Sequence, residues 1–199
     1  MGKSTLFNAI TAAGAEASNY PFCTVEPNIA TVPVPDRRLE ELARIVNPEK
    51  IIPTAIEFVD IAGLVKGASE GEGLGNKFLS YIREVDAIIH VVRCFKDENV
   101  SHTYPDIEPV RDAEVVNLEL ILADLESLEK RIDKEHRMAK SGEKKYITVY
   151  ELLGRVKEEL VKGIPIRNME FGGEERIIIG ELFLLSAKPV IYAANIDEA

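Results

Sequence analysis

The sequence of 199 residues contains only two cysteines, Cys23 and Cys94. Because they are isolated and far apart, they match neither a zinc site nor a disulfide framework. We interpret both as free thiols in a reducing compartment, where they serve as small apolar core residues. The sequence also has no run of about 18 apolar residues, so no membrane span is expected. We therefore predict a cytoplasmic protein without a membrane partner.

Positive charge is also scarce, since 24 basic residues face 34 acidic ones and the net charge is −10. This balance argues against indiscriminate binding to nucleic acid. The exception is the segment 130–145, KRIDKEHRMAKSGEKK, which has seven Lys or Arg against three Asp or Glu. Such a basic segment can make a directed contact with RNA, and it could equally be the solvated end of a helix.

Apolar periodicity predicts strands that alternate with helices at the two ends of the chain. Alternation of this kind is typical of a parallel α/β sheet. The expected strands cover 29–34, 54–63, 87–95 and 188–199, and the expected helices cover 3–13, 36–46 and 76–85.

Between residues 112 and 185 the sequence predicts helices alone. Apolar residues recur at steps of three and four in two stretches, and a polar joint at 140–145 separates the stretches. This pattern indicates an antiparallel coiled-coil hairpin, after which a helix at about 174–186 returns the chain to the sheet. The repeating positions are Leu118, Ile121, Leu125, Leu128 and Ile132, followed by Val149, Leu153, Val156 and Leu160.

The tripeptide Gly2-Lys3-Ser4 stands before the first predicted helix. It matches the second half of a P-loop, G-x-x-x-x-G-K-[ST], in which the Lys reaches the β- and γ-phosphates and the hydroxyl binds Mg²⁺. The positive end of the following helix attracts the anion. Because GKS also occurs by chance in exposed turns, the assignment needs support from other motifs.

A second candidate motif is Asp60 with Gly63, which follows a strand predicted to be buried. In P-loop nucleotidases an Asp here binds Mg²⁺, directly or through water, and the Gly lets a backbone N–H approach the γ-phosphate. A helix N-cap is the alternative. Thr24 lies in the loop where such proteins place a threonine that senses Mg²⁺ and γ-phosphate, although it could be an ordinary exposed residue.

The third motif is Asn195-Ile196-Asp197-Glu198, after the last predicted strand. An Asn at the carboxyl edge of a sheet can hold loops together and face a nucleotide base. GTP-specific proteins carry N-K-x-D here, and the Asp accepts hydrogen bonds from guanine. The Lys is missing in this chain and the longer Glu198 spoils the fit, so we predict relaxed or altered base choice. A simple turn is the alternative.

Taken together, four stretches resemble the YchF/Obg-like ATPase family, an Obg-type branch of the translation-factor P-loop nucleotidases. They are GKSTLFNA, NYPFCTVEPN, FVDIAGLVKGASEGEGLGN and AANIDE. The resemblance extends over essentially the whole chain, the helical segment included. It implies a protein that hydrolyses ATP in preference to GTP, depends on Mg²⁺ and binds ribosomes.

The resemblance also implies a role for each matching residue. Lys3 would contact the β- and γ-phosphates, and Ser4 and Thr24 would bind Mg²⁺. The other nucleotide-binding residues would be Gly2 and Thr5 in the first loop, Asp60 and Gly63 at the second switch, and Asn195, Ile196 and Glu198 at the base pocket.

Leu64 directly follows D-x-x-G, where Ras-like proteins have a water-orienting Gln. Since leucine cannot hold a water molecule, another group must orient the nucleophile, or hydrolysis is slow and assisted. His102, just beyond the strand at 87–95, is the candidate catalytic residue, because imidazole exchanges protons near neutral pH. A surface-loop histidine is the alternative.

The expected fold is an α/β P-loop nucleotidase with a parallel sheet and an inserted coiled-coil hairpin. Its nucleotide domain would cover 1–111, the insertion 112–186, and the return strand with the base motif 187–199. Compared with the family pattern, the first strand, the start of the P-loop, the end of the nucleotide domain and the C-terminal TGS domain are missing. We therefore expect this chain to fold poorly or bind nucleotide weakly, and a completed form to be a competent ATPase.

The leading hypothesis is an Mg²⁺-dependent P-loop ATPase that acts as a ribosome-associated switch and contacts ribosomal RNA through 130–145. One alternative is an Obg-like GTPase, which the Asn195 motif disfavours. Another is a nucleotide-gated binding module with vestigial catalysis, which Leu64 and the incomplete P-loop favour.

Overall fold

The computed structural model describes residues 2–11, 27–61, 74–97, 104 and 106–197. The chain forms two compact units, Met1–Gly63 and Leu64–Ala199, and each is described by itself below. The division of the chain by function, with limits at residues 111 and 186, stays a prediction.

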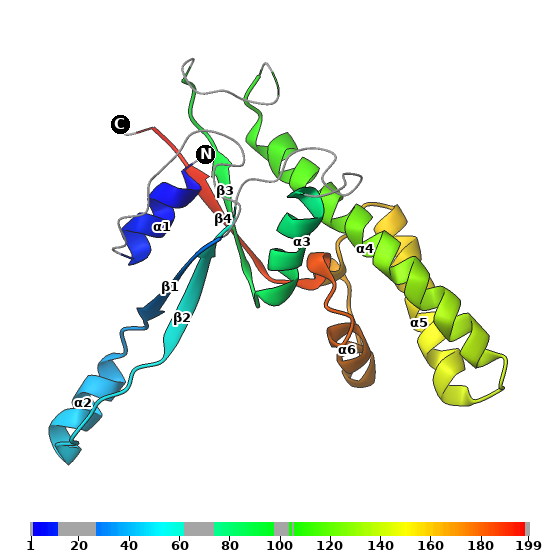
Figure 1. Cartoon of the computed structure of the whole chain (residues 1–199), viewed down its shortest axis with the longest axis horizontal. Helices are drawn as coiled ribbons and strands as arrows, with labels where there is room; N and C mark the ends of the chain where they lie inside the picture. The colour runs from blue at the N-terminus through cyan, green and yellow to red at the C-terminus, as the bar shows by residue number, and fades with distance from the viewer. Residues whose placement is uncertain (1, 12–26, 62–73, 98–103, 105, 198–199) are drawn as a thin grey trace. The chain divides into compact units, whose positions relative to one another are not determined.

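The first unit combines two strands with two helices (Figure 1). The strands pair antiparallel, from Asn28 opposite Asp60 to Pro33 opposite Ala55. This pairing differs from the predicted parallel arrangement, because the chain turns back at the second helix instead of crossing over the sheet. The elements are α1 (Lys3–Thr11), β1 (Asn28–Pro33), α2 (Arg37–Val46) and β2 (Ala55–Asp60).

The second unit contains the parallel pair that the sequence predicts. Strand β3 (Ile88–Arg93) lies beside β4 (Val190–Asn195), with Ile88 opposite Val190 and Arg93 opposite Asn195. Parallel strands need a long crossover connection, and here the whole helical segment supplies it. Helix α3 (Leu74–Glu84) precedes β3.

The crossover is dominated by a hairpin of two antiparallel helices, α4 (Pro109–Ala139) and α5 (Lys144–Val161) (Figure 1). Gly142 in the connecting turn has φ of 81°, a left-handed conformation that glycine adopts without strain. Within the described ranges, none of the helices has the length and apolar character needed to cross a membrane.

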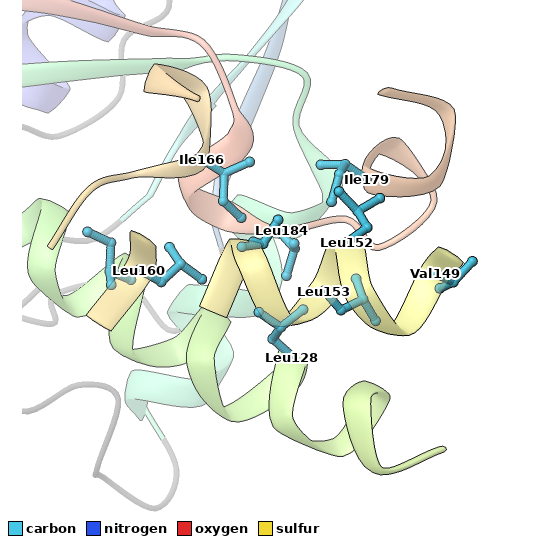
Figure 2. Close-up of a cluster of buried hydrophobic side chains, with 10 residues drawn as sticks. Leu128, Val149, Leu152, Leu153, Leu160, Ile166, Ile179 and Leu184 are labelled. Atoms are coloured by element: carbon cyan, nitrogen blue, oxygen red, sulfur yellow. The ribbon is translucent and has the colours of Figure 1, made fainter. Parts of the chain in front are cut away.

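The core of the second unit lies where the hairpin meets the segments that follow it (Figure 2). The four predicted positions of α5 are all buried, as are Ile121 and Leu128 of α4. Leu118, however, is 50% exposed. Helix α4 has 31 residues and α5 only 18, so the first turns of α4 extend beyond the end of α5. The core cluster consists of Ile121, Leu128, Val149, Leu152, Leu153, Val156, Leu160, Ile166, Ile179 and Leu184.

The return to the sheet differs from the single helix predicted over 174–186. Helix α6 (Gly173–Gly180) is short, and a separate 3₁₀ turn, η2 (Leu185–Ala187), follows it. Phe183 between them has φ of 49°, which a right-handed helix cannot contain. Another 3₁₀ turn, η1 (Ile166–Asn168), lies before α6.

A buried carboxylate on α4 fixes the start of η2. Asp124 is fully buried, and its two oxygens accept hydrogen bonds from the backbone N–H groups of Leu185 and Ser186, each at 2.7 Å. Next to this junction, the Lys188 ammonium donates to the carbonyls of Arg83, at 3.0 Å, and of Val85. These contacts join α4, the end of α3 and the segment that leads into β4.

Burial raises the pKa of Asp124, although the two backbone N–H groups oppose that shift. A carboxyl with a raised folded-state pKa favours folding when it is protonated, and this contribution is lost as pH rises through that pKa. The free energy of unfolding of the wild type, relative to Asp124→Asn, should therefore fall as pH rises from about 4 to 7. Urea unfolding at several pH values measures this difference.

Glu126→Gln is the matched control on the same helix. Glu126 is exposed, and its hydrogen bond with Lys130 lowers its pKa. The free energy of unfolding of the wild type, relative to Glu126→Gln, should therefore rise slightly as pH rises. The prediction would be contradicted if the free energy of unfolding of the wild type, relative to Asp124→Asn, stayed constant or grew as pH rises.

Candidate nucleotide-binding site

The structure brings Ser4 and Asp60 together, although 56 positions separate them in the sequence. The Ser4 hydroxyl donates to Oδ2 of Asp60 at 2.6 Å, and the contact is partly buried. Ser4 lies in the first turn of α1 and Asp60 ends β2. Helix α1 contacts both strands of the first unit, and Phe7 is its buried residue. The contact therefore joins the GKS motif to the end of the D-x-x-G strand.

Gly2 gives the start of α1 its geometry. Its φ of 89° lies in the left-handed region, where a side chain would be strained. Its carbonyl accepts the N–H of Leu6 at 2.9 Å. Lys3 and Ser4 follow as the first helical residues, and both are half-buried, while Thr5 is exposed. The first N–H groups of a helix have no partner within it and favour an anion.

The pairing of Ser4 with Asp60 suits a magnesium ion. Mg²⁺ takes oxygen ligands, and in nucleotide sites it is bound by one or two protein groups plus phosphates and water. A serine hydroxyl directly beside a carboxylate provides such a donor set. The two residues would hold the ion from α1 and β2 together.

The end of β4 carries the candidate base motif. Asn195 is its last residue, and its carbonyl accepts the N–H of Cys94 at 2.7 Å. Ile196 follows and is 69% exposed. Asn195 and Ile196 thus stand at the carboxyl edge of a parallel strand pair, where α/β proteins bind ligands.

Sequence analysis missed one residue at this edge, Arg93. Its side chain is only 6% exposed. Its guanidinium donates from Nε to the carbonyl of Phe95 at 3.1 Å and from Nη2 to the carbonyl of Asp97 at 2.9 Å. It also lies over the Phe95 ring, 4.6 Å from the centroid. The available signal was a charged residue at the end of the apolar run Ile88–Arg93.

Several predicted residues lie outside the described part of the chain, and their roles stay predictions. Among the described ones, Gly2, Lys3, Ser4, Thr5 and Asp60 belong to the first unit, and Asn195 and Ile196 belong to the second. Those outside are Thr24, Gly63, Leu64, His102 and Glu198.

Residues 1–151 match the sequence model of a family described as 50S ribosome-binding GTPases. The chain belongs to this family. It is similar to the ribosome-binding ATPase YchF of Bacillus subtilis, with 54% identity over 198 residues, and to that of Escherichia coli O157:H7, with 50%. The resemblance to YchF that the motifs indicated is confirmed.

Among solved structures, the YchF GTPase of Schizosaccharomyces pombe matches with a TM-score of 0.77 and 38% sequence identity. This match confirms the expected P-loop nucleotidase fold. In all three comparisons the alignment covers 100% of this chain and 54% of the relative. The chain thus spans about half the length of these YchF proteins. The bacterial relatives are named ATPases and the yeast relative a GTPase, so the names differ on the nucleotide base.

The contact between Ser4 and Asp60 predicts an energetic coupling between α1 and β2. Ser4→Ala and Asp60→Asn should each lower the free energy of unfolding, and the double variant should lose less than the sum. The coupling should be about 1–2 kcal/mol, as expected for a hydrogen bond to a charged group in a partly exposed position. Urea unfolding of the four proteins measures it.

Thr11→Val is the control, because the Thr11 hydroxyl donates to the carbonyl of Phe7, one turn earlier in the same helix, at 2.8 Å. Combined with Asp60→Asn, it should be additive. If the losses in free energy of unfolding of Ser4→Ala and Asp60→Asn also added up in the double variant, the two residues would not interact.

Proposed function

We propose that this chain forms the nucleotide-binding part of an Mg²⁺-dependent ATPase that acts as a nucleotide switch on the ribosome. The observation that carries the proposal is the contact between Ser4 and Asp60. It places the hydroxyl of a GKS motif and the carboxylate of a D-x-x-G motif side by side, as binding of a magnesium–triphosphate complex requires. Membership of the 50S ribosome-binding GTPases and the names of the bacterial YchF relatives support it.

In this mechanism the start of α1 binds the triphosphate. Gly2 sets the backbone so that the first N–H groups of the helix meet the phosphate oxygens, and Thr5 contacts the α-phosphate. The Lys3 ammonium lies at this helix start and neutralises charge on the β- and γ-phosphates. Ser4 and Asp60 orient each other through their hydrogen bond and would hold the metal. When bound, Mg²⁺ would stabilise negative charge that develops on the transferred phosphoryl group.

We assign the switch to Thr24 and Gly63, and the hydrolytic step to the region of Leu64 and His102. Thr24 and Gly63 would contact the γ-phosphate, so that hydrolysis releases both segments. Leu64 gives no polar group to the attacking water, and His102 would orient that water and accept its proton. This division of roles predicts slow hydrolysis that another component accelerates.

ATP is the proposed substrate. Asn195, Ile196 and Glu198 would form the base pocket, and a motif without the Lys and Asp of N-K-x-D loses two of the groups that select guanine. GTP remains the second candidate, because the Schizosaccharomyces pombe relative and the family are both described as GTPases. The two candidates differ only in the base, so one experiment separates them.

Turnover of ATP and GTP by a form extended to the full length of the YchF relatives, taken as the wild type, and by its Lys3→Ala variant tests the proposal. The wild type should hydrolyse ATP with the higher kcat/KM. Lys3→Ala should lose about 100-fold or more, the usual effect of removing a group that stabilises transition-state charge. Release of inorganic phosphate measures the rate, and Lys50→Ala, an exposed lysine of the first unit, is the control. Equal rates in wild type and Lys3→Ala would disprove hydrolysis at this site.

The proposed ribosome contact is the tip of the α4–α5 hairpin, which would place the protein in the cytoplasm. Lys140, Lys144 and Lys145 are exposed around the turn. Further down α4, Lys130 and Arg131 already pair with glutamates at 2.6 and 2.9 Å. Exposed lysines at a turn can neutralise RNA phosphates and release counterions. We therefore propose that ribosomal RNA is the partner of this tip.

Charge reversal at the tip tests this contact. Lys144→Glu/Lys145→Glu should reduce co-sedimentation with ribosomes and weaken its salt dependence, because two phosphate contacts are lost. The matched control is Lys157→Glu/Lys162→Glu, which makes the same change in net charge away from the turn, at lysines that pair with Glu129 and Glu159. Equal loss in both double variants would point to net charge and reject the tip as the contact.

A further inference from the structure

The second unit holds a buried guanidinium at the carboxyl end of a strand. Arg93 is the last residue of β3, and only 6% of its surface is exposed. Burying a charged group is costly unless hydrogen bonds replace its hydration. Arg93 has such bonds, to the carbonyls of Phe95 and Asp97, and it also stacks on the Phe95 ring.

These partners show what Arg93 does to the backbone. Both carbonyls belong to the segment directly after β3, so the guanidinium holds residues 95–97 close to the end of its own strand. A planar guanidinium can donate to two carbonyls at once from a fixed fork of N–H groups. A lysine retains the charge but not this fork, and an apolar residue provides no donor.

Cys94, the residue between Arg93 and the held segment, is hydrogen-bonded directly to Asn195. In the parallel ladder Arg93 lies opposite Asn195, so their side chains leave the sheet on the same face. The next bond along the ladder is donated by Cys94 to the Asn195 carbonyl, at 2.7 Å. Cys94 therefore lies between Arg93 and Phe95, whose carbonyl the Arg93 guanidinium holds.

We propose that Arg93 is a positioning residue for recognition of a purine base. By fixing residues 94–97 it holds Cys94 against Asn195, and through that bond it sets the orientation in which the Asn195 amide meets the base. This inference rests on the proposed function, because it assigns Asn195 to the base pocket. It adds that base recognition depends on a buried side chain that acts through the backbone next to Asn195.

The test compares two ligands. ATP contains the base, whereas inorganic tripolyphosphate presents only phosphates. In the full chain, Arg93→Met should raise the Kd for ATP about tenfold, as expected when an oriented hydrogen-bonding group is lost. The Kd for tripolyphosphate should change less than twofold. Isothermal titration in Mg²⁺ measures both constants.

A double-mutant cycle shows whether Arg93 acts through Asn195. Asn195→Ala should itself weaken ATP binding, and Arg93→Met should have little further effect in that background. Arg93→Lys should fall between wild type and Arg93→Met, and it replaces Arg93→Met if circular dichroism shows that the latter is unfolded. Arg155→Met is the matched control, because Arg155 is an exposed arginine paired with Glu175 at 2.8 Å.

Three other results would contradict the inference or the proposed function. Equal loss of ATP and tripolyphosphate affinity would assign Arg93 a general structural role and overturn the inference. Additive effects of the Arg93 and Asn195 variants on ATP binding would do the same, while the proposed function would stand. If Asn195→Ala binds ATP as tightly as wild type, the proposed base pocket itself is wrong.

Discussion

One buried carboxylate governs how the helical segment returns to the sheet. Asp124 accepts the first two N–H groups of η2, and a buried carboxylate without such donors would be strongly destabilising. These bonds hold the start of η2 against α4, a few residues before β4. Because β4 ends at Asn195, the hairpin core and the edge that carries the candidate base motif are connected through η2 and β4.

At the two candidate ligand-binding edges, polar side chains that are buried or partly buried also have hydrogen-bond partners. Ser4 donates a hydrogen bond to Asp60 between α1 and β2. Arg93 donates hydrogen bonds to two carbonyls beyond β3. In both places a polar side chain fixes the backbone from which functional groups project. Such pre-organised groups favour ligand binding, because binding energy spent on ordering a loop is not available for recognition.

The helical hairpin gives the molecule a second kind of surface. Its apolar seam is buried against η1, α6 and η2 (Figure 2), whereas its turn presents exposed lysines. A rigid hairpin with a charged end suits contact with a large polyanion, because the contact orders few additional residues. Membership of the 50S ribosome-binding GTPases is consistent with this arrangement.

Local patterns in the sequence determined the family, the motifs, most helix and strand positions, and the buried face of α5. A motif or an apolar period involves residues that are close in the sequence, so it can be recognised without knowledge of distant contacts. Only the tertiary structure decided that β1 and β2 pair antiparallel, that Leu118 lies beyond α5, and that Phe183 interrupts the final helix. It also decided that Asp124 caps a turn 61 residues away and that Arg93 is buried. These features arise from contacts between segments far apart in the chain, and the chemistry of a single residue does not specify its distant partner.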